Sequence, residues 1–175
     1  NYYVQFRLED GTITAPKSTG TPNKKEAQLM KSLLREEILN KINDGVTRFI
    51  AGGAIGFDTL AAEQVIDIKQ DYPQIKLVLY LPCKNHFARW VQRDVERFHE
   101  ITKHADEVKY VYEGKYIPGC MQMRNNAMVK DSDCGIVYLA NRMGSGSAQT
   151  ASYAKEKGIP FVNIVDEIKK YADCE

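Results

Sequence analysis

The fold is decided by residues 49–63, which read FIAGGAIGFDTLAAE. The apolar run at 47–51 predicts a buried strand, because it is rich in β-branched and aromatic residues. A turn of small residues follows, made of Gly52, Gly53, Ala54 and Gly56. Asp58 then stands where the N-cap of a helix is expected. Glycines allow close approach to a ligand, and free N–H groups at a helix start attract anions, so the stretch predicts an anion site. A tight turn without a ligand is the alternative.

A second glycine-rich stretch, NRMGSGS at 141–147, follows the strand predicted at 134–139. Backbone N–H groups and serine hydroxyls of such a loop can hold a phosphate. The residues concerned are Gly144, Ser145, Gly146 and Ser147. Neither loop matches a Walker A sequence or a GxGxxG fingerprint with its distant acidic residue. Two strand–loop–helix units nevertheless favour a phosphate-bearing ligand over a simple crossover turn.

Helical and strand patterns alternate from residue 23 onward, which predicts an α/β, Rossmann-like parallel sheet with helices on both faces. Helices are expected at 23–43, 58–68, 85–104, 121–130, 148–157 and 166–172, and strands at 47–51, 76–81, 107–112, 134–139 and 160–164. In such sheets ligands bind at the carboxyl ends of the strands, so the two loops are expected to frame one cleft. Residues 1–22 are expected to form an N-terminal hairpin and loop, and residues 23–175 the nucleotide-binding domain.

Composition excludes several classes of function. The chain has 175 residues and a formal net charge of +1, which provides no overall field for nucleic acid or an anionic membrane. No apolar run approaches the roughly 20 residues needed to span a bilayer, and no signal peptide is visible. The four cysteines are widely separated, at Cys83, Cys120, Cys134 and Cys174. They predict reduced thiols in the cytoplasm, and neither a metal site nor a cofactor is expected.

Two further candidates lie on the helix expected at 121–130. Arg124 could pair with a phosphate through two parallel hydrogen bonds, or could simply face solvent, and Asn125 lies beside it. Asp58 could bind ribose hydroxyls instead of capping a helix, and Glu63 could be a general base or a surface residue. Trp90 is expected to pack in the core, and the three histidines, His86, His99 and His104, show no metal-ligand spacing.

Several motifs together resemble the YpsA-like branch of the SLOG superfamily, which also contains DNA-processing protein A and the "lonely guy" phosphoribohydrolases. They are GGAIGFDTLAAE, LVLYLPC, ARW, ADEVKYV, GCMQMRNNAMVKDSDCGIVYL and GSGSAQTASYAKEKGIPFVNI. The resemblance covers residues 19–164. It implies a Rossmann-like sheet that binds nucleotides or derivatives such as ADP-ribose or NAD. Many members are regarded as sensors, and the branch is bacterial.

The chain departs from these relatives in two places. Where the branch has Thr-Gly-His-Arg-Pro, this chain has Thr19, Gly20, Thr21 and Pro22, so only Thr19 and Gly20 remain as implied contacts. The phosphoribohydrolases carry an Arg that Arg124 matches. Their catalytic Glu falls on Thr150, however, and the Thr of the same motif on Ser147. The resemblance therefore implies that the hydrolytic carboxylate is absent.

These observations predict a cytoplasmic sensor domain for a nucleotide-derived small molecule rather than an enzyme. A nucleoside-phosphate N-glycosidic hydrolase is the alternative, with Asp58, Glu63 or Asp133 as its carboxylate. A module for single-stranded DNA is disfavoured by the even charge and the lack of a basic aromatic stripe. A homo-oligomer and a regulatory protein partner stay open, and no membrane association is expected.

Overall fold

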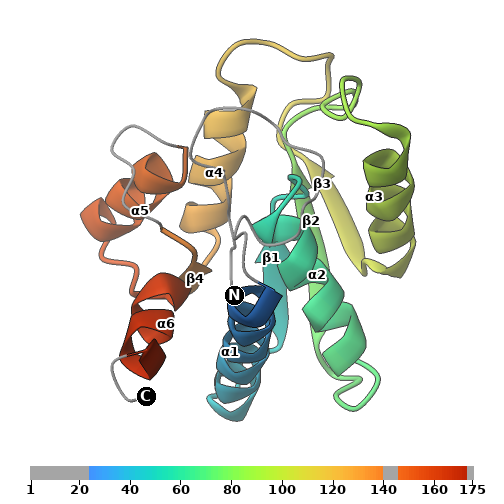
Figure 1. Ribbon diagram of the computed structural model, residues 1–175. Coiled ribbons are helices and arrows are strands. Elements are labelled where there is room, and N and C mark those ends of the chain that lie inside the picture. Colours follow the sequence, from blue (N-terminus) through green and yellow to red (C-terminus); the bar gives the residue numbers. More distant parts are fainter. Residues whose placement is uncertain (1–23, 140–145, 173–175) are drawn as a thin grey trace.

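Helices and strands alternate along the chain in this computed structural model, which describes residues 24–139 and 146–172 (Figure 1). The helices are α1 (Lys24–Asn43), α2 (Phe57–Ile68), α3 (Gln92–His104), α4 (Cys120–Lys130), α5 (Gly146–Glu156) and α6 (Ile164–Ala172). The strands are β1 (Arg48–Ala51), β2 (Lys76–Leu81), β3 (Glu107–Tyr110), β4 (Gly135–Val137) and β5 (Phe161–Asn163). The hairpin expected within residues 1–22 lies outside the described residues, as does its boundary with the following domain.

All paired strands run parallel. The first three form a sheet in the order β1-β2-β3, and β4 pairs with β5 in a second sheet. In the register of the first sheet Ala51 lies opposite Leu79, so β1 and β2 end at the same edge. The expectation of an α/β, Rossmann-like fold is confirmed, with the described strands divided between two parallel sheets.

Alternation along β1 and β2 divides the apolar core into two layers, because successive side chains point to opposite faces of a sheet. One face packs against α1, α2 and α3 through Phe49, Ala51, Leu77, Leu79 and Leu81. The other face packs against α4 and α5 through Ile50, Val78 and Tyr80. Helices therefore cover both faces, as predicted, and Figure 1 shows α1, α2 and α3 lying on the opposite side of β1 and β2 from α4.

Predicted helix starts differ from the observed ones, and the starts of α3 and α2 bear on the site. Helix α3 begins at Gln92, and residues 85–90 form turns in which the backbone N–H of Ala88 donates to Asn85 and that of Trp90 donates to Phe87. Tertiary packing of aromatic side chains from this segment overrides its helical pattern. Helix α2 begins at Phe57, so its N-cap is Gly56, at φ 106°, and not Asp58.

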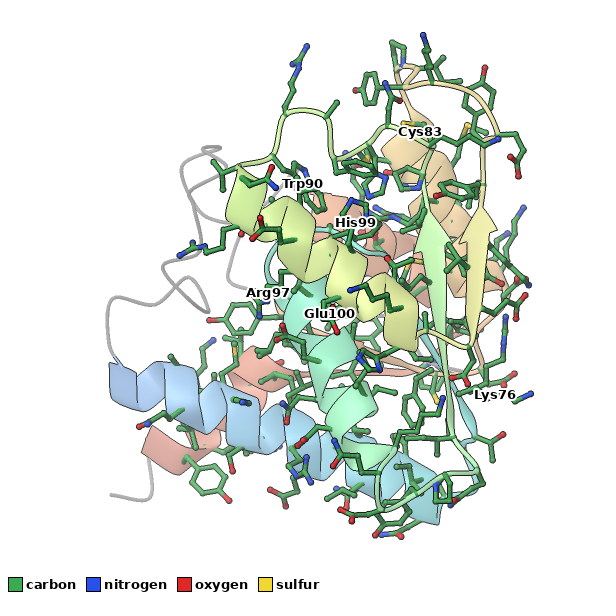
Figure 2. The ribbon with its side chains drawn as sticks, turned by 90° about the vertical axis from the view of Figure 1, so that its right-hand side faces the viewer. Lys76, Cys83, Trp90, Arg97, His99 and Glu100 are labelled. Carbon is green, nitrogen blue, oxygen red and sulfur yellow. The ribbon has the colours of Figure 1, made fainter. Side chains whose placement is uncertain are left out.

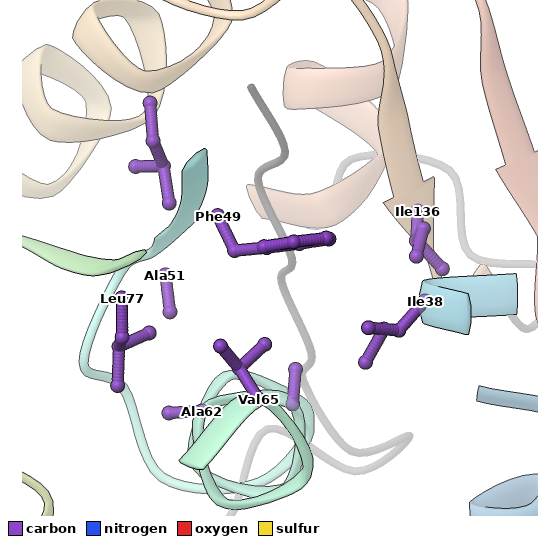
Figure 3. Close-up of a pocket in the computed structure, with 9 residues that line it drawn as sticks. Ile38, Phe49, Ala51, Ala62, Val65, Leu77 and Ile136 are labelled. Carbon is purple, nitrogen blue, oxygen red and sulfur yellow. The ribbon is translucent and has the colours of Figure 1, made fainter. Parts of the chain in front are cut away.

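Figure 3 shows an apolar pocket between α1, α2, β1 and β4. It is lined by Ile38, Phe49, Ile50, Ala51, Ala61, Ala62, Val65, Leu77 and Ile136. These side chains offer no polar atom to a phosphate or a sugar. The pocket is therefore distinct from the site that the glycine-rich turns predict.

The part of the chain that the structure describes contains no helix long and apolar enough to cross a membrane. Within the same ranges, no three His, Cys, Asp or Glu residues gather where they could hold a metal ion. Cys83 and Cys120 are buried reduced thiols, and Cys174 lies outside the described residues.

Candidate ligand-binding site

The turn after β1 is tied to helix α4 by a buried arginine. Nη1 of Arg124 donates a hydrogen bond to the carbonyl of Gly52 and lies 3.3 Å from Oδ2 of Asp58. The same carboxylate oxygen accepts a hydrogen bond of 3.2 Å from the backbone N–H of Ala54. The side chains of Arg124 and Asp58 are 3% and 0% exposed. We call Gly52, Ala54, Asp58 and Arg124 the Arg124 cluster. It lies at the carboxyl end of β1, where the sequence predicts a site.

Two glycines of the turn are required by contacts within the protein. A Cβ on Gly52 would lie 2.0 Å from Nη1 of Arg124 and 2.6 Å from Oδ2 of Asp58. Gly53 has φ +65°, and a Cβ there would lie 2.5 Å from Cδ2 of Leu81. The Arg124 cluster and the packing beneath it therefore account for both glycines, whether or not a ligand binds.

Burial controls the electrostatics of the Arg124 cluster. Desolvation raises the pKa of Asp58 from 3.8 to about 6, although the charge of Arg124 and the N–H of Ala54 act to lower it. Desolvation also lowers the pKa of Arg124, and the charge of Asp58 opposes this change. Each charge thus offsets only part of the cost of burying the other. The site consequently holds a carboxyl group that titrates close to neutral pH.

Asp58 is expected to make the folded state less stable as the pH rises from about 4 to about 6. In this range the folded protein keeps a proton that the unfolded chain has released, because the folded pKa is about 6 and the ordinary value is 3.8. Relative to Asp58→Asn, the wild type should lose up to about 3 kcal/mol of unfolding free energy between about pH 4 and pH 7. Denaturant titrations of both proteins measure this difference. Parallel pH profiles would show that Asp58 titrates with an ordinary pKa.

Four of the side chains predicted from the sequence to lie at the site carry a buried polar atom without a hydrogen-bond partner among the described residues. These atoms are Asp58 Oδ1, Arg124 Nε, Asn125 Oδ1 and Ser147 Oγ. Their residues are 0%, 2%, 3% and 6% exposed, respectively. Leaving a buried polar group unsatisfied costs about 1–3 kcal/mol, so few such groups occur in folded proteins. These four atoms are candidate ligand contacts, and Nε2 of His86, a residue that the sequence did not predict, is a fifth.

Helix α4 lies between the turn after β1 and helix α5. It carries Arg124, which bonds to the turn after β1, and it packs against α5 on its other side. Helix α5 begins at Gly146, two residues before its predicted start, so Ser147 lies in its first turn. Gly144 and Ser145 lie outside the described residues, as do Thr19 and Gly20. The contact of all these residues with one ligand stays a prediction.

Three alternatives for charged residues are decided by their surroundings. Arg124 is 2% exposed, so the view of it as a solvated helix residue is wrong. Both carboxylate oxygens of Glu63 accept hydrogen bonds of 2.5 Å from Arg97, which occupies this side chain in an ion pair between α2 and α3. Asp133 precedes β4 and therefore lies at the amino end of that strand, whereas the predicted site lies at the carboxyl ends of the strands. Asp58 is the one of the three carboxylates that lies within the Arg124 cluster.

His86 adjoins the site, although no spacing in the sequence indicates it. Its Nδ1 lies 3.0 Å from the carbonyl of Cys83, and its ring makes edge contacts with Phe87, Trp90 and Phe98 at centroid distances of 5.1–5.4 Å. Burial lowers the pKa of His86, and the charge of Arg124 acts in the same direction. Figure 2 shows Trp90 near the start of α3, His99 beside the middle of this helix and Cys83 above the strands. The signal in the sequence was its position just after the carboxyl end of a predicted strand.

The comparison with known proteins identifies a family and several relatives of this chain. The family model for YpsA, described as the "YspA SLOG family", matches residues 21–162. A UPF0398 protein of Halalkalibacterium halodurans is 32% identical over 122 residues, which are 67% of this chain and 62% of that protein. A UPF0398 protein of Staphylococcus haemolyticus is 26% identical over 140 residues, which are 79% of this chain and 72% of that protein. The chain thus spans slightly less than two thirds of the first relative.

A solved structure shows the same fold. DNA processing protein A from Helicobacter pylori, described for its single-stranded DNA binding mode, has a TM-score of 0.58 and 20% identity to this chain. The superposition covers 98% of this chain and 72% of that protein. At this level of identity the likeness establishes the fold alone.

Proposed function

Because this chain belongs to the YpsA SLOG family, we propose that it binds a nucleotide-derived, phosphate-bearing ligand such as ADP-ribose or NAD and acts as a sensor in the bacterial cytoplasm. The observation that supports this proposal is the group of four unpartnered buried atoms on Asp58, Arg124, Asn125 and Ser147. They come from three helices, two of which begin directly after a glycine-rich stretch. A polar ligand at the carboxyl edge of the strands would satisfy them.

Titration calorimetry and thermal unfolding with ADP-ribose, NAD and AMP test the proposal. A ligand present at 100 times its dissociation constant adds about 2.7 kcal/mol to the free energy of unfolding, which gives a clear rise in Tm. Asn125→Leu and Ser147→Ala should each weaken binding at least fivefold. Asn126→Ala and Ser152→Ala, on the same helices, are the matched controls and should bind as the wild type does. If none of the three compounds binds the wild type, the proposal is refuted.

A second candidate function is hydrolysis of an N-glycosidic bond, and the surroundings of Asp58 favour it. A carboxyl group with a pKa of about 6 can give and take protons near neutral pH, as general acids and bases do. Against hydrolysis stands Thr150, which occupies the position of the phosphoribohydrolase Glu. Its hydroxyl donates a hydrogen bond of 2.8 Å to the carbonyl of Gly146, so it forms part of the helix start.

We expect no appreciable release of free base from AMP or GMP. Glycosidic cleavage builds positive charge on the sugar, and loss of one group that stabilises such charge commonly costs a factor of about 100–1,000 in rate. Chromatography of reactions with the wild type and with Asp58→Asn measures this release. Rapid turnover by the wild type that disappears in Asp58→Asn would establish the hydrolase and refute the sensor.

Single-stranded DNA is the ligand class suggested by the structural neighbour from Helicobacter pylori. The net charge of +1 does not favour it in this chain, since nucleic-acid binding depends on neutralising phosphates. A fluorescent oligothymidylate, titrated at low and at high salt, provides the comparison. Tight, salt-dependent binding that ADP-ribose does not displace would support the DNA-binding class instead.

A further inference from the structure

The unpartnered atoms of the site differ in what they can bind. Asp58 Oδ1 and Asn125 Oδ1 are acceptors, the former whenever the carboxyl group is ionised. A phosphate at neutral pH offers acceptor oxygens and negative charge, so it cannot satisfy either atom. The ligand group that lies against Asp58 and Asn125 must therefore donate hydrogen bonds.

Arg124 is not arranged to hold a phosphate by itself. Its Nη1 is already bonded to the carbonyl of Gly52, and its charge is offset by Asp58 at 3.3 Å. A phosphate brought to this guanidinium would also meet the buried carboxylate of Asp58. Nε has no hydrogen-bond partner among the described residues, so it can donate to an uncharged acceptor beside Asp58.

The start of α5 has the opposite character. Ser147 lies in the first turn of a helix of 11 residues, is 6% exposed, and has an unpartnered hydroxyl that can donate. The N–H groups of that turn add the positive end of the helix dipole. No carboxylate is found within α5 before Glu156, in its last turn. This end of the site can therefore accept an anion.

We propose that the site recognises its ligand by the hydroxyl groups of a ribose, which donate hydrogen bonds to Oδ1 of Asp58 and Oδ1 of Asn125. The phosphate of the same ligand lies toward Ser147 at the start of α5. This inference rests on the nucleotide-binding function proposed above. It assigns a direction to the ligand, with its sugar between α2 and α4 and its phosphate at α5.

Calorimetric titration with AMP and with 2′,3′-dideoxy-AMP tests the ribose contact directly, since the two compounds share their base and phosphate. The wild type should bind AMP about tenfold more tightly, the effect of losing one or two hydrogen bonds. In Asn125→Leu, the affinity for AMP should fall toward that for the dideoxy compound. The affinity for the dideoxy compound itself should change less than twofold. Ser147→Ala should lower the affinity for both compounds by the same factor, because it removes a phosphate contact. Asn126→Ala is the control, because the side-chain oxygen of Asn126 already accepts a hydrogen bond from Gln122.

The outcomes separate this inference from the proposed function. If the wild type binds AMP and dideoxy-AMP equally, the ribose contact is refuted while nucleotide binding stands. If it binds neither compound, nor ADP-ribose, nor NAD, nucleotide binding itself is refuted, and the ribose contact with it. The wild-type comparison requires no variant, so a folding defect in Asn125→Leu cannot obscure the result.

Discussion

Gly52→Ala is expected to destabilise the protein by about 3–5 kcal/mol and to abolish ligand binding. The new methyl group would lie 2.0 Å from Nη1 of Arg124 and 2.6 Å from Oδ2 of Asp58. The end of an arginine side chain usually moves aside cheaply, but this one is 2% exposed and has no solvent to move into. The substitution should therefore separate the buried pair, and denaturant unfolding with calorimetry of AMP binding measures both effects.

Gly158→Ala is the matched control for this substitution. Gly158 has φ +69°, and a Cβ there would meet no atom within 4 Å. Its replacement therefore costs only the strain of a left-handed conformation, about 1–2 kcal/mol, and should leave binding unchanged. A Gly52→Ala protein as stable as Gly158→Ala would mean that Arg124 can leave its position without breaking a needed contact.

Arg124→Leu is expected to cost about 3–5 kcal/mol, because it leaves the carboxylate of Asp58 buried without a compensating charge. The charge of Arg124 lowers the pKa of Asp58, so the pKa should rise further in the variant. The loss of stability should consequently be larger at pH 8 than at pH 5, where Asp58 is protonated. The stability of Arg124→Lys should lie between those of the wild type and Arg124→Leu, since an ammonium group retains the charge but not the planar set of donors.

A double-mutant cycle separates the ion pair from other effects of the substitution. Combining Arg124→Leu with Asp58→Asn removes both charges and should recover part of the stability lost in Arg124→Leu alone. Arg93 on α3 provides a control, because its side chain is 64% exposed. Arg93→Leu should change the free energy of unfolding by no more than about 0.5 kcal/mol. Strictly additive losses at Arg124 and Asp58 would show that the two charges do not stabilise each other.

Local sequence patterns were sufficient for the order and type of the described helices and strands, although not for every boundary. The continuous apolar run of β2 predicted the strand with its observed bounds, Lys76–Leu81, because a strand buried on both faces needs apolar residues at nearly every position. The glycines after β1 and the helical spacing after them predicted the strand–turn–helix unit. The order of these units predicted helices on both faces of parallel strands, which depends on chain connectivity rather than on any single contact.

The same patterns could not reveal the state of the side chains at the site. The chemistry of Arg124 is set by the carbonyl of Gly52, which is 72 residues away in the sequence, and by the burial that α4 acquires between the sheet and α5. Burial also raised the pKa of Asp58. Tertiary packing placed Arg97 against Glu63, and it placed the ring of His86 among aromatic side chains instead of in a helix. The periodicity of a sequence fixes which residues form strands and helices, because those depend on neighbours along the chain. Partners and desolvation depend on elements that meet only in the folded protein, so the tertiary structure alone decided which polar atoms at this edge of the sheet are left for a ligand.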